Sequence, residues 1–295
     1  MALLNDPASQ PSQMWAVIRY LAYAKKPVKY EGARMLLSPP SLGDDGKMFD
    51  WAVETLKELR MVAQTDTGEL RLDGVAAQLD GEDFGVFAAV LRTCVLAPEL
   101  NTGVGNDASQ VGPRDLTRAL AWFLSLDPVT SSLNWSEAQR LQGRALRPEV
   151  GKAIVNDTRW PRFVAWATAL GLAAADLLVN DRIVPDCTAA VKRVMQDMGK
   201  PGHVVDALEA LRTLRTSLPV LPGGAFSAAV GIPDPGATAT GRALSFALLR
   251  GEDEGWLRLD RPGADARRFL SIPDPERPDA PRACRSIAIL EDGRA

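Results

Sequence analysis

The chain has 295 residues, 46% hydrophobic and 24% charged, a globular composition long enough for two or three domains. Its formal net charge of −3 excludes a protein that coats nucleic acid by bulk positive charge, although it leaves room for a local basic face. No apolar run approaches the roughly 20 residues of a membrane-spanning helix, so we expect no membrane partner.

Residues 1–97 predict a first module of three helices and a hairpin. "MWAVIRYLAYAKKP" places Ile18 and Leu21 on one helical face, and Pro27 ends that helix. A short helix in "YEGARMLLSPPSLGDDG" and an amphipathic helix in "MFDWAVETLKELRM" follow. In "QTDTGELRLD", Gly68 marks a turn before a half-buried strand. Helix, helix, helix and hairpin is the order of a winged helix-turn-helix module.

A second module with the same order is expected at residues 114–200, after a linker at 98–113. Its helices lie in "RDLTRALAWFLSL", in "NWSEAQRLQGRAL", which Asn134 or Ser136 could cap, and in "NDTRWPRFVAWATALGLA". The last of these occupies the position of the recognition helix. "DLLVNDRIVPD" predicts two wing strands that are joined at a tight turn.

Residues 201–295 predict a helix, a partial third module and a Pro-rich tail. "TATGRALSFALLRGEDEGWLRLDRPGADARRFLSI" runs from helix to strand to turn. We expect residues 273–282 to be irregular and residues 287–290 to add an edge strand. The fold class is therefore mainly α with small β wings, built as tandem winged helix-turn-helix modules. The alternative is a helical protein with a few hairpins.

Few side chains of this sequence suggest catalysis or metal binding. His203 is the one histidine and is expected at a helix start. Cys94, Cys187 and Cys284 are far apart, which favours small buried side chains in a reducing compartment. "GEDEG" at 251–255 is more typical of a solvated turn than of a cation site. We therefore expect no metal, no cofactor and no enzyme, with a nuclease or other enzyme as the alternative.

The start of the chain, "MALLNDPASQPSQMW", has neither the basic head nor the apolar middle of a secretory signal. Together with the cysteine pattern, this predicts a cytoplasmic protein.

The second module contains the candidate DNA-binding surface. Residues 137–162 hold six cations and only three acidic residues, whereas the third helix of the first module carries Glu54 and Glu58, which would repel phosphates. Residues 156–158 could cap the recognition helix and direct its N-terminal amides at a phosphate. Trp160 could stack on a base, but core packing is favoured. The candidate DNA-binding residues are Arg144, Arg147, Lys152, Arg159, Arg162 and Arg182.

Three functional hypotheses follow from this charge distribution. The first is a non-enzymatic accessory subunit that binds duplex DNA through phosphates, with little base readout. The second is an adaptor whose winged helices assemble other proteins without binding DNA. The third is a regulator of its own operon, which would need dimerisation, but no coiled-coil heptads are visible to supply it.

Three segments carry a resemblance to a known family: "MWAVIRYLAYAKKPV", "RWPRFVAWATALGLA" and "RALSFALLRGEDEGWLRL". With them the chain resembles the DpdG proteins, which occur in bacterial defence islands and in clusters that place 7-deazaguanine bases in DNA. The resemblance implies an accessory component that works beside ATPase or nuclease subunits in phage defence. It supplies no catalytic residues.

Overall fold

The computed structural model of the chain describes residues 2–5, 10–43, 46–106, 108–144, 146–263 and 268–291. Two compact units are present. Unit 1 comprises Met1–Thr102, Ser109–Leu116 and Thr158–Leu170, and unit 2 comprises Gly103–Ala108, Thr117–Asp157 and Gly171–Ala295. Both units therefore draw on non-consecutive segments, whereas the sequence divides the chain into consecutive modules.

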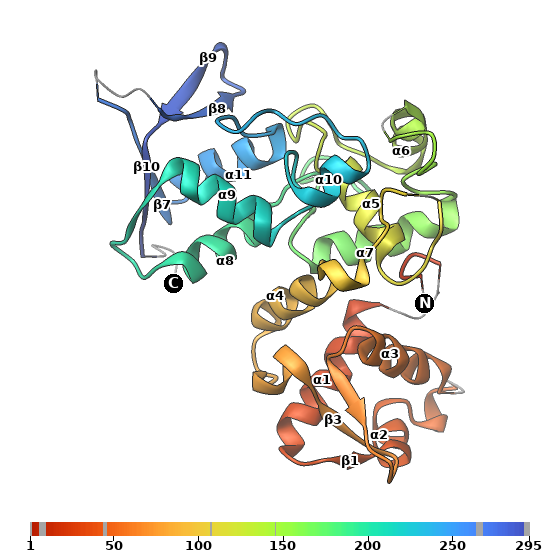
Figure 1. Cartoon of the computed structure of the whole chain (residues 1–295). Coiled ribbons are helices and arrows are strands. Elements are labelled where there is room, and N and C mark those ends of the chain that lie inside the picture. Colours follow the sequence, from red (N-terminus) through yellow and green to blue (C-terminus); the bar gives the residue numbers. More distant parts are fainter. Residues whose placement is uncertain are drawn as a thin grey trace. The chain divides into compact units, whose positions relative to one another are not determined.

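Helices dominate both units, and every paired strand lies in a small antiparallel sheet (Figure 1). The mainly α class with small β elements is confirmed. Within the described ranges, no helix is long and apolar enough to cross a membrane.

The first part of unit 1 alternates helices with a three-stranded sheet. Its elements are α1 (Pro11–Ala24), β1 (Val28–Lys29), α2 (Tyr30–Leu37), the 3-10 turn Pro40–Leu42, α3 (Lys47–Glu58), β2 (Val62–Gln64) and β3 (Glu69–Leu72). The sheet order is β1-β3-β2, with Val28 opposite Leu70 and Val62 opposite Leu72. The sequence analysis missed β1, because two residues are too few to show an alternating pattern.

Apolar residues at helical spacing hold these elements together. Met14, Ile18 and Leu21 of α1 are buried, as are Phe49 and Leu56 of α3. These two helices pack on each other, and α1 also contacts β3. The β2–β3 turn needs a glycine, because Gly68 has a φ of 78°. The local predictions for this module are therefore confirmed, apart from the missing strand.

Two further helices lie wholly in unit 1. They are α4 (Phe84–Val95), which follows the 3-10 turn Gly74–Gln78, and α7 (Trp160–Ala169), which follows the 3-10 turn Asp157–Arg159. The Asp83 side chain caps α4, whereas the N-cap residue of α7 is Arg159, whose side chain makes no capping bond. The N-cap position is therefore not among residues 156–158, where the sequence placed it. Trp160 is buried and packs on Phe163 at 5.6 Å between ring centroids, which confirms its core position.

The middle of the chain contributes short elements to unit 2. Helix α5 (Arg114–Phe123) begins in unit 1 and ends in unit 2, and α6 (Trp135–Leu141) follows it after the isolated bridge residue Leu133. Asn134 caps α6 through a reciprocal capping box with Glu137. The hairpin expected here is shorter than predicted: β4 (Ala174–Ala175) pairs with β5 (Ile183–Val184), and Leu133 pairs with Ile183 on the other side.

The C-terminal part of unit 2 has the same order of helices and strands as the first part of unit 1, with one helix and one hairpin inserted. Its elements are α8 (Thr188–Met198), β6 (Val204–Asp206), α9 (Ala207–Ser217), α10 (Ala225–Ala229), α11 (Arg242–Asp253), β7 (Leu257–Asp260), β8 (Leu270–Asp274), β9 (Arg277–Cys284) and β10 (Ser286–Ile289). The sheet order is β6-β10-β7, and the chain between β7 and β10 forms a separate hairpin of β8 and β9 (Figure 1).

Three sequence predictions for this region were wrong. Residues 287–290 overlap β10, which is the central strand of its sheet, not an edge. Residues 273–282 belong largely to the β8–β9 hairpin, where the prolines of β9 are tolerated because that strand pairs only with β8. His203 lies exposed in the turn before β6, and the following helix begins at Ala207 with Asp206 as its cap.

Helix α11 is the most buried helix of this region. Leu244, Ala247 and Leu248 are buried, and the helix packs against α8, β7 and β8. Gly251 allows Trp256 to approach, because an added Cβ would lie 2.4 Å from the indole ring. The "GEDEG" segment is therefore mostly the last turn of a packed helix, not the solvated turn that the sequence predicted.

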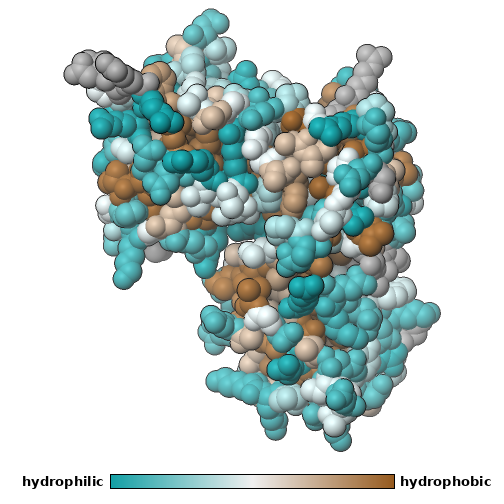
Figure 2. Space-filling view, in the orientation of Figure 1, coloured by the Kyte–Doolittle hydropathy of each residue, from teal (hydrophilic) through white to brown (hydrophobic). Residues whose placement is uncertain are grey.

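Hydrophobic side chains also reach the surface of both units, as the brown areas of Figure 2 show. In unit 1, Tyr23 and Met35 are exposed, and in unit 2, Leu177 and Leu178 are 96% and 94% exposed. The two leucines lie in the loop between β4 and β5.

Candidate functional site

Two of the predicted DNA-binding arginines are bonded to the first residues of the chain. Arg162 Nη1 donates to the carbonyl oxygens of Leu4 at 3.0 Å and of Asn5 at 2.6 Å. Arg159 Nη2 donates to Asn5 Oδ1 at 2.9 Å. Both guanidinium groups therefore hold this N-terminal turn (residues 3–5) within unit 1.

A carboxylate also holds the N-terminal turn. Asp115, at the start of α5, accepts the Leu4 amide at 2.8 Å, and Leu3 and Leu4 are buried. Burial raises the pKa of Asp115, while its backbone hydrogen bonds and the charge of Arg159 act in the opposite direction. The turn is thus fixed by polar contacts from segments more than 100 residues away in sequence.

Arg182 is also bonded to protein oxygens. Its Nη2 lies 2.9 Å from Glu137 Oε1, and its Nη1 donates to the Ser132 carbonyl at 3.0 Å. The Ser132 hydroxyl donates to Asp176. This hydrogen bond, together with those from the amides of Leu178 and Val179, lowers the pKa of Asp176. Arg182 therefore ties the β4–β5 hairpin to the start of α6.

The other three predicted cations lie in unit 2 around the turn that follows α6. Arg147 is exposed and its Nη2 donates to the Ala228 carbonyl at 3.4 Å, while Lys152 is exposed. Arg144 lies in the 3-10 turn Gln142–Arg144, and its side chain is outside the described part of the structure. The structure thus places Arg159 and Arg162 in unit 1 and the remaining four in unit 2.

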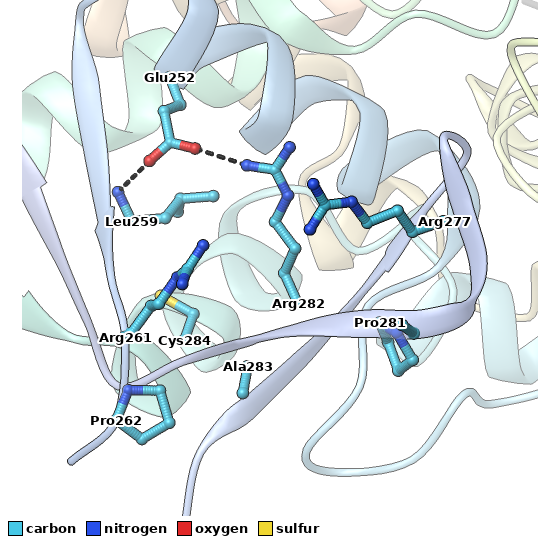
Figure 3. A pocket seen from close by; sticks show the side chains of 10 residues that line it. Glu252, Leu259, Arg261, Pro262, Arg277, Pro281, Arg282, Ala283 and Cys284 are labelled. Atoms are coloured by element: carbon cyan, nitrogen blue, oxygen red, sulfur yellow. Dashed lines mark hydrogen bonds and ion pairs between the residues drawn. The ribbon is translucent and has the colours of Figure 1, made fainter.

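A different group of arginines lines a pocket in unit 2 of about 450 Å³. Its floor and walls come from the end of α11, from β7 and the residues after it, and from β9. Figure 3 shows the guanidinium ends of Arg261 and Arg277 turned toward Arg282 from either side. Apolar side chains, among them Leu259 and Pro281, also line the pocket. We call this the arginine pocket.

One arginine of the pocket forms ion pairs, and the other two form none with the residues that the structure describes. Arg282 Nε lies 2.7 Å from Asp274 Oδ2, and its Nη1 lies 2.8 Å from Glu252 Oε2. Glu252 Oε1 also accepts the Leu259 amide at 3.0 Å. Within the described ranges, Arg261 and Arg277 have no ion-pair partner.

The carboxylate beneath the pocket is buried and ionised. Asp274 is 2% exposed, and its hydrogen bond with Arg282 holds its pKa below the usual range. The pair fixes the direction of the Arg282 side chain, so that guanidinium group is positioned before any ligand arrives. The sequence analysis missed this pocket because its three arginines are dispersed over residues 261–282. Two of them, Arg277 and Arg282, lie in the segment 273–282, which was expected to be irregular.

The loop between β4 and β5 presents an apolar surface on an ordered backbone. Asp176 Oδ1 accepts the amides of Leu178 at 2.7 Å and Val179 at 3.1 Å, which fixes the turn. Asp181 adopts a left-handed φ of 62° at the end of the same loop. Leu177, Leu178 and Val179, which we call the apolar tip, are all exposed.

The described residues contain no group of three or more His, Cys, Asp or Glu side chains that could hold a metal ion. All three cysteines are buried free thiols, which agrees with the prediction of buried side chains. Burial raises the pKa of Cys94 to about 11 and that of Cys284 to about 12. These groups therefore stay protonated at neutral pH.

Comparison with known proteins gives one family. The model of the family described as DpdG-like matches residues 1–266, which confirms the resemblance that the three quoted segments carry. No curated protein and no solved structure matches the chain.

Proposed function

Because the chain belongs to the DpdG-like family, we propose that it is a non-enzymatic accessory protein of a DNA-modification or defence cluster. We propose further that it acts as a winged-helix adaptor, which holds other proteins of the cluster together. The observation that carries this choice is the bonding of Arg159 and Arg162 to the N-terminal turn, because it occupies the cations on which DNA binding was predicted to depend.

The order of elements supports three winged-helix modules. The first has the order helix, strand, helix, helix, strand, strand, with its first strand beside its third. The second module has the same strand order if the bridge at Leu133 stands for its first strand. The third has it in β6-β10-β7, with a helix and a hairpin inserted. A helical protein with a few scattered hairpins would not be expected to have the same strand order in three places. The shared order therefore favours winged-helix modules over that alternative.

None of the three recognition-helix positions offers a basic helix for a DNA groove. Helix α3 exposes Glu54 and Glu58, which oppose phosphate binding. Helix α11 is largely buried within unit 2. Helix α7 begins at the arginines that hold the N-terminal turn. These facts favour contacts with proteins over contacts with DNA.

The apolar tip is the surface we assign to partner binding. Leu177 and Leu178 are adjacent and both more than nine-tenths exposed, so this chain leaves their apolar surface in water. Exposed apolar surface of this kind often marks a site where another protein binds. Their loop is held by Asp176 and by Arg182, so the partner would meet an ordered surface. A partner of complementary chemistry would be an apolar patch on another protein of the cluster, such as an ATPase or a nuclease.

Co-expression with the neighbouring cluster proteins tests this proposal. We expect a stable complex on size-exclusion chromatography, and we expect the double variant Leu177→Ser/Leu178→Ser to lower its affinity by at least about tenfold, because burying two leucines contributes several kcal/mol. Val129→Ser, at another exposed apolar position of unit 2, is the matched control. A complex that survives the double variant would refute the apolar tip as the contact.

Duplex DNA binding is the second candidate function, and Arg140 and Lys152 favour it, because both are exposed and have no ion-pair partner among the described residues. Fluorescence anisotropy of a labelled random duplex, at low and physiological salt, tests it. If it is right, Arg140→Glu/Lys152→Glu weakens binding and lowers the salt slope by about one for each lost phosphate contact. Lys25→Glu/Lys26→Glu is the control in unit 1. If the control variant lost as much DNA affinity as Arg140→Glu/Lys152→Glu, the loss would reflect net charge, and no specific DNA site would lie beside α6.

A further inference from the structure

We propose that the arginine pocket of unit 2 is a binding site for a phosphate group, carried by a nucleotide or by the backbone of a nucleic acid. The inference rests on the convergence of Arg261, Arg277 and Arg282 on one cavity and not on the adaptor proposal. The apolar tip lies on a different loop, so either assignment can fail without the other.

The side chains that line the pocket favour an anion, because three of them are arginines and only Glu252 is acidic. The carboxylates of Glu252 and the buried Asp274 are both bonded to Arg282, and the charge of Asp253 also acts on Arg282. Arg261 and Arg277 form no ion pair with the described residues, so they bring two guanidinium groups to the cavity that can donate to an anion. A bound anion accepts hydrogen bonds from both groups and reduces the repulsion between them.

The arrangement fits a phosphate better than a carboxylate. A carboxylate presents two oxygens in one plane, whereas a phosphate presents several oxygens in different directions. In Figure 3 Arg261 and Arg277 extend into the pocket from opposite sides of the Arg282 side chain. Guanidinium forks also match the spacing of phosphate oxygens.

The size and lining of the pocket leave room for more than the phosphate. Its volume of about 450 Å³ lies within the range of small-molecule sites. Leu259, Pro262, Pro281 and Ala283 give apolar contact area beside the cations. A sugar or a base attached to the phosphate could pack on these side chains.

Binding to the full chain is measured by isothermal titration calorimetry with orthophosphate, AMP and ATP, and by anisotropy with a 5′-phosphorylated oligonucleotide. Arg261→Gln and Arg277→Gln each remove one unpaired charge and leave the Arg282–Asp274 pair intact. Arg285→Gln removes an exposed charge that is close in sequence but does not line the pocket. Circular dichroism and thermal melting establish that each variant folds.

We expect at least one phosphate ligand to bind the wild type, and we expect Arg261→Gln and Arg277→Gln each to weaken it about tenfold or more, because a hydrogen bond to a charged group has about that strength. Arg285→Gln should bind as the wild type does. Preference for AMP or ATP identifies a nucleotide as the source of the phosphate, and preference for the oligonucleotide identifies the nucleic-acid backbone. Absence of binding by all four ligands, or an equal loss in Arg285→Gln, would overturn the proposal.

Discussion

Several arginine side chains of this protein link parts of the chain that are distant in sequence. Arg162 joins α7 to the carbonyl groups of Leu4 and Asn5, and Arg92 donates from α4 to the carbonyl of Leu170 at 2.8 Å. A guanidinium group suits this task because it donates several hydrogen bonds in fixed directions. An arginine-rich stretch in this sequence therefore does not by itself indicate a nucleic-acid surface.

The Arg282–Asp274 pair should contribute to the stability of unit 2. Arg282→Ala leaves a buried carboxylate without its partner, and we expect the free energy of unfolding to fall by about 2 kcal/mol at neutral pH. Urea denaturation followed by circular dichroism measures the loss. Arg258→Ala, which breaks an exposed pair with Asp260, should cost less than about 1 kcal/mol and serves as the control.

The same pair should make stability depend on pH in acid. The pKa of Asp274 is lower in the folded chain than in the unfolded chain, so its contribution is present above the unfolded pKa of about 4. It is lost as the pH falls through the folded pKa. The gap in urea midpoint between the wild type and Arg282→Ala should therefore narrow below pH of about 4. A gap that stayed constant would show that the ion pair is not its cause.

At the scale of single elements, two helical glycines should respond in opposite directions to alanine. Gly32 in α2 has nothing within 4 Å of an added Cβ, so Gly32→Ala should stabilise the chain by about 0.5–1 kcal/mol. Gly251 in α11 would place its Cβ against the Trp256 ring, so Gly251→Ala should destabilise it by about 1–3 kcal/mol. Thermal melting of both variants measures the signs. Stabilisation by Gly251→Ala would contradict the packing of α11 on Trp256.

Elements with strong local patterns could be predicted from the sequence, and those that depend on distant partners could not. Helix α3 was found because Phe49, Val53 and Leu56 recur at helical spacing and are buried as expected. Strand β6 was missed because it has three residues and only its middle one is buried. Its partner β10 lies about 80 residues later, so no local signal indicated that β10 is central.

The candidate sites show the same limit. The exposed leucines of the apolar tip stand in a segment where the sequence predicted a wing, but only the structure shows that they lie outside the strands. The contacts of Arg159 with Asn5 span 154 positions, so a charge count along the second module could not reveal them. The arginine pocket could be predicted only if the β8–β9 hairpin was predicted, and the prolines of this hairpin favoured an irregular segment instead.

At the scale of the whole molecule, the interleaved units should make the chain intolerant of truncation. Deletion of residues 1–97 removes most of unit 1 but leaves Thr158–Leu170, with Phe163 and Trp166 buried in the intact chain. We expect this fragment to bind the dye ANS and to aggregate on size-exclusion chromatography, because it exposes apolar side chains. A fragment that is monomeric and binds no ANS would show that α7 does not need unit 1.

The division of unit 1 into three stretches also has a consequence at the ribosome. Its last stretch, Thr158–Leu170, is translated only after Thr117–Asp157 of unit 2 has been made. At roughly 5–20 residues per second, the nascent N-terminal region waits several seconds for α7. During that time Leu4 lacks the guanidinium group that later binds its carbonyl. Unit 1 therefore cannot be completed until residue 170 has been made, and slow codons between 103 and 157 would lengthen the exposure of its core to chaperones and proteases.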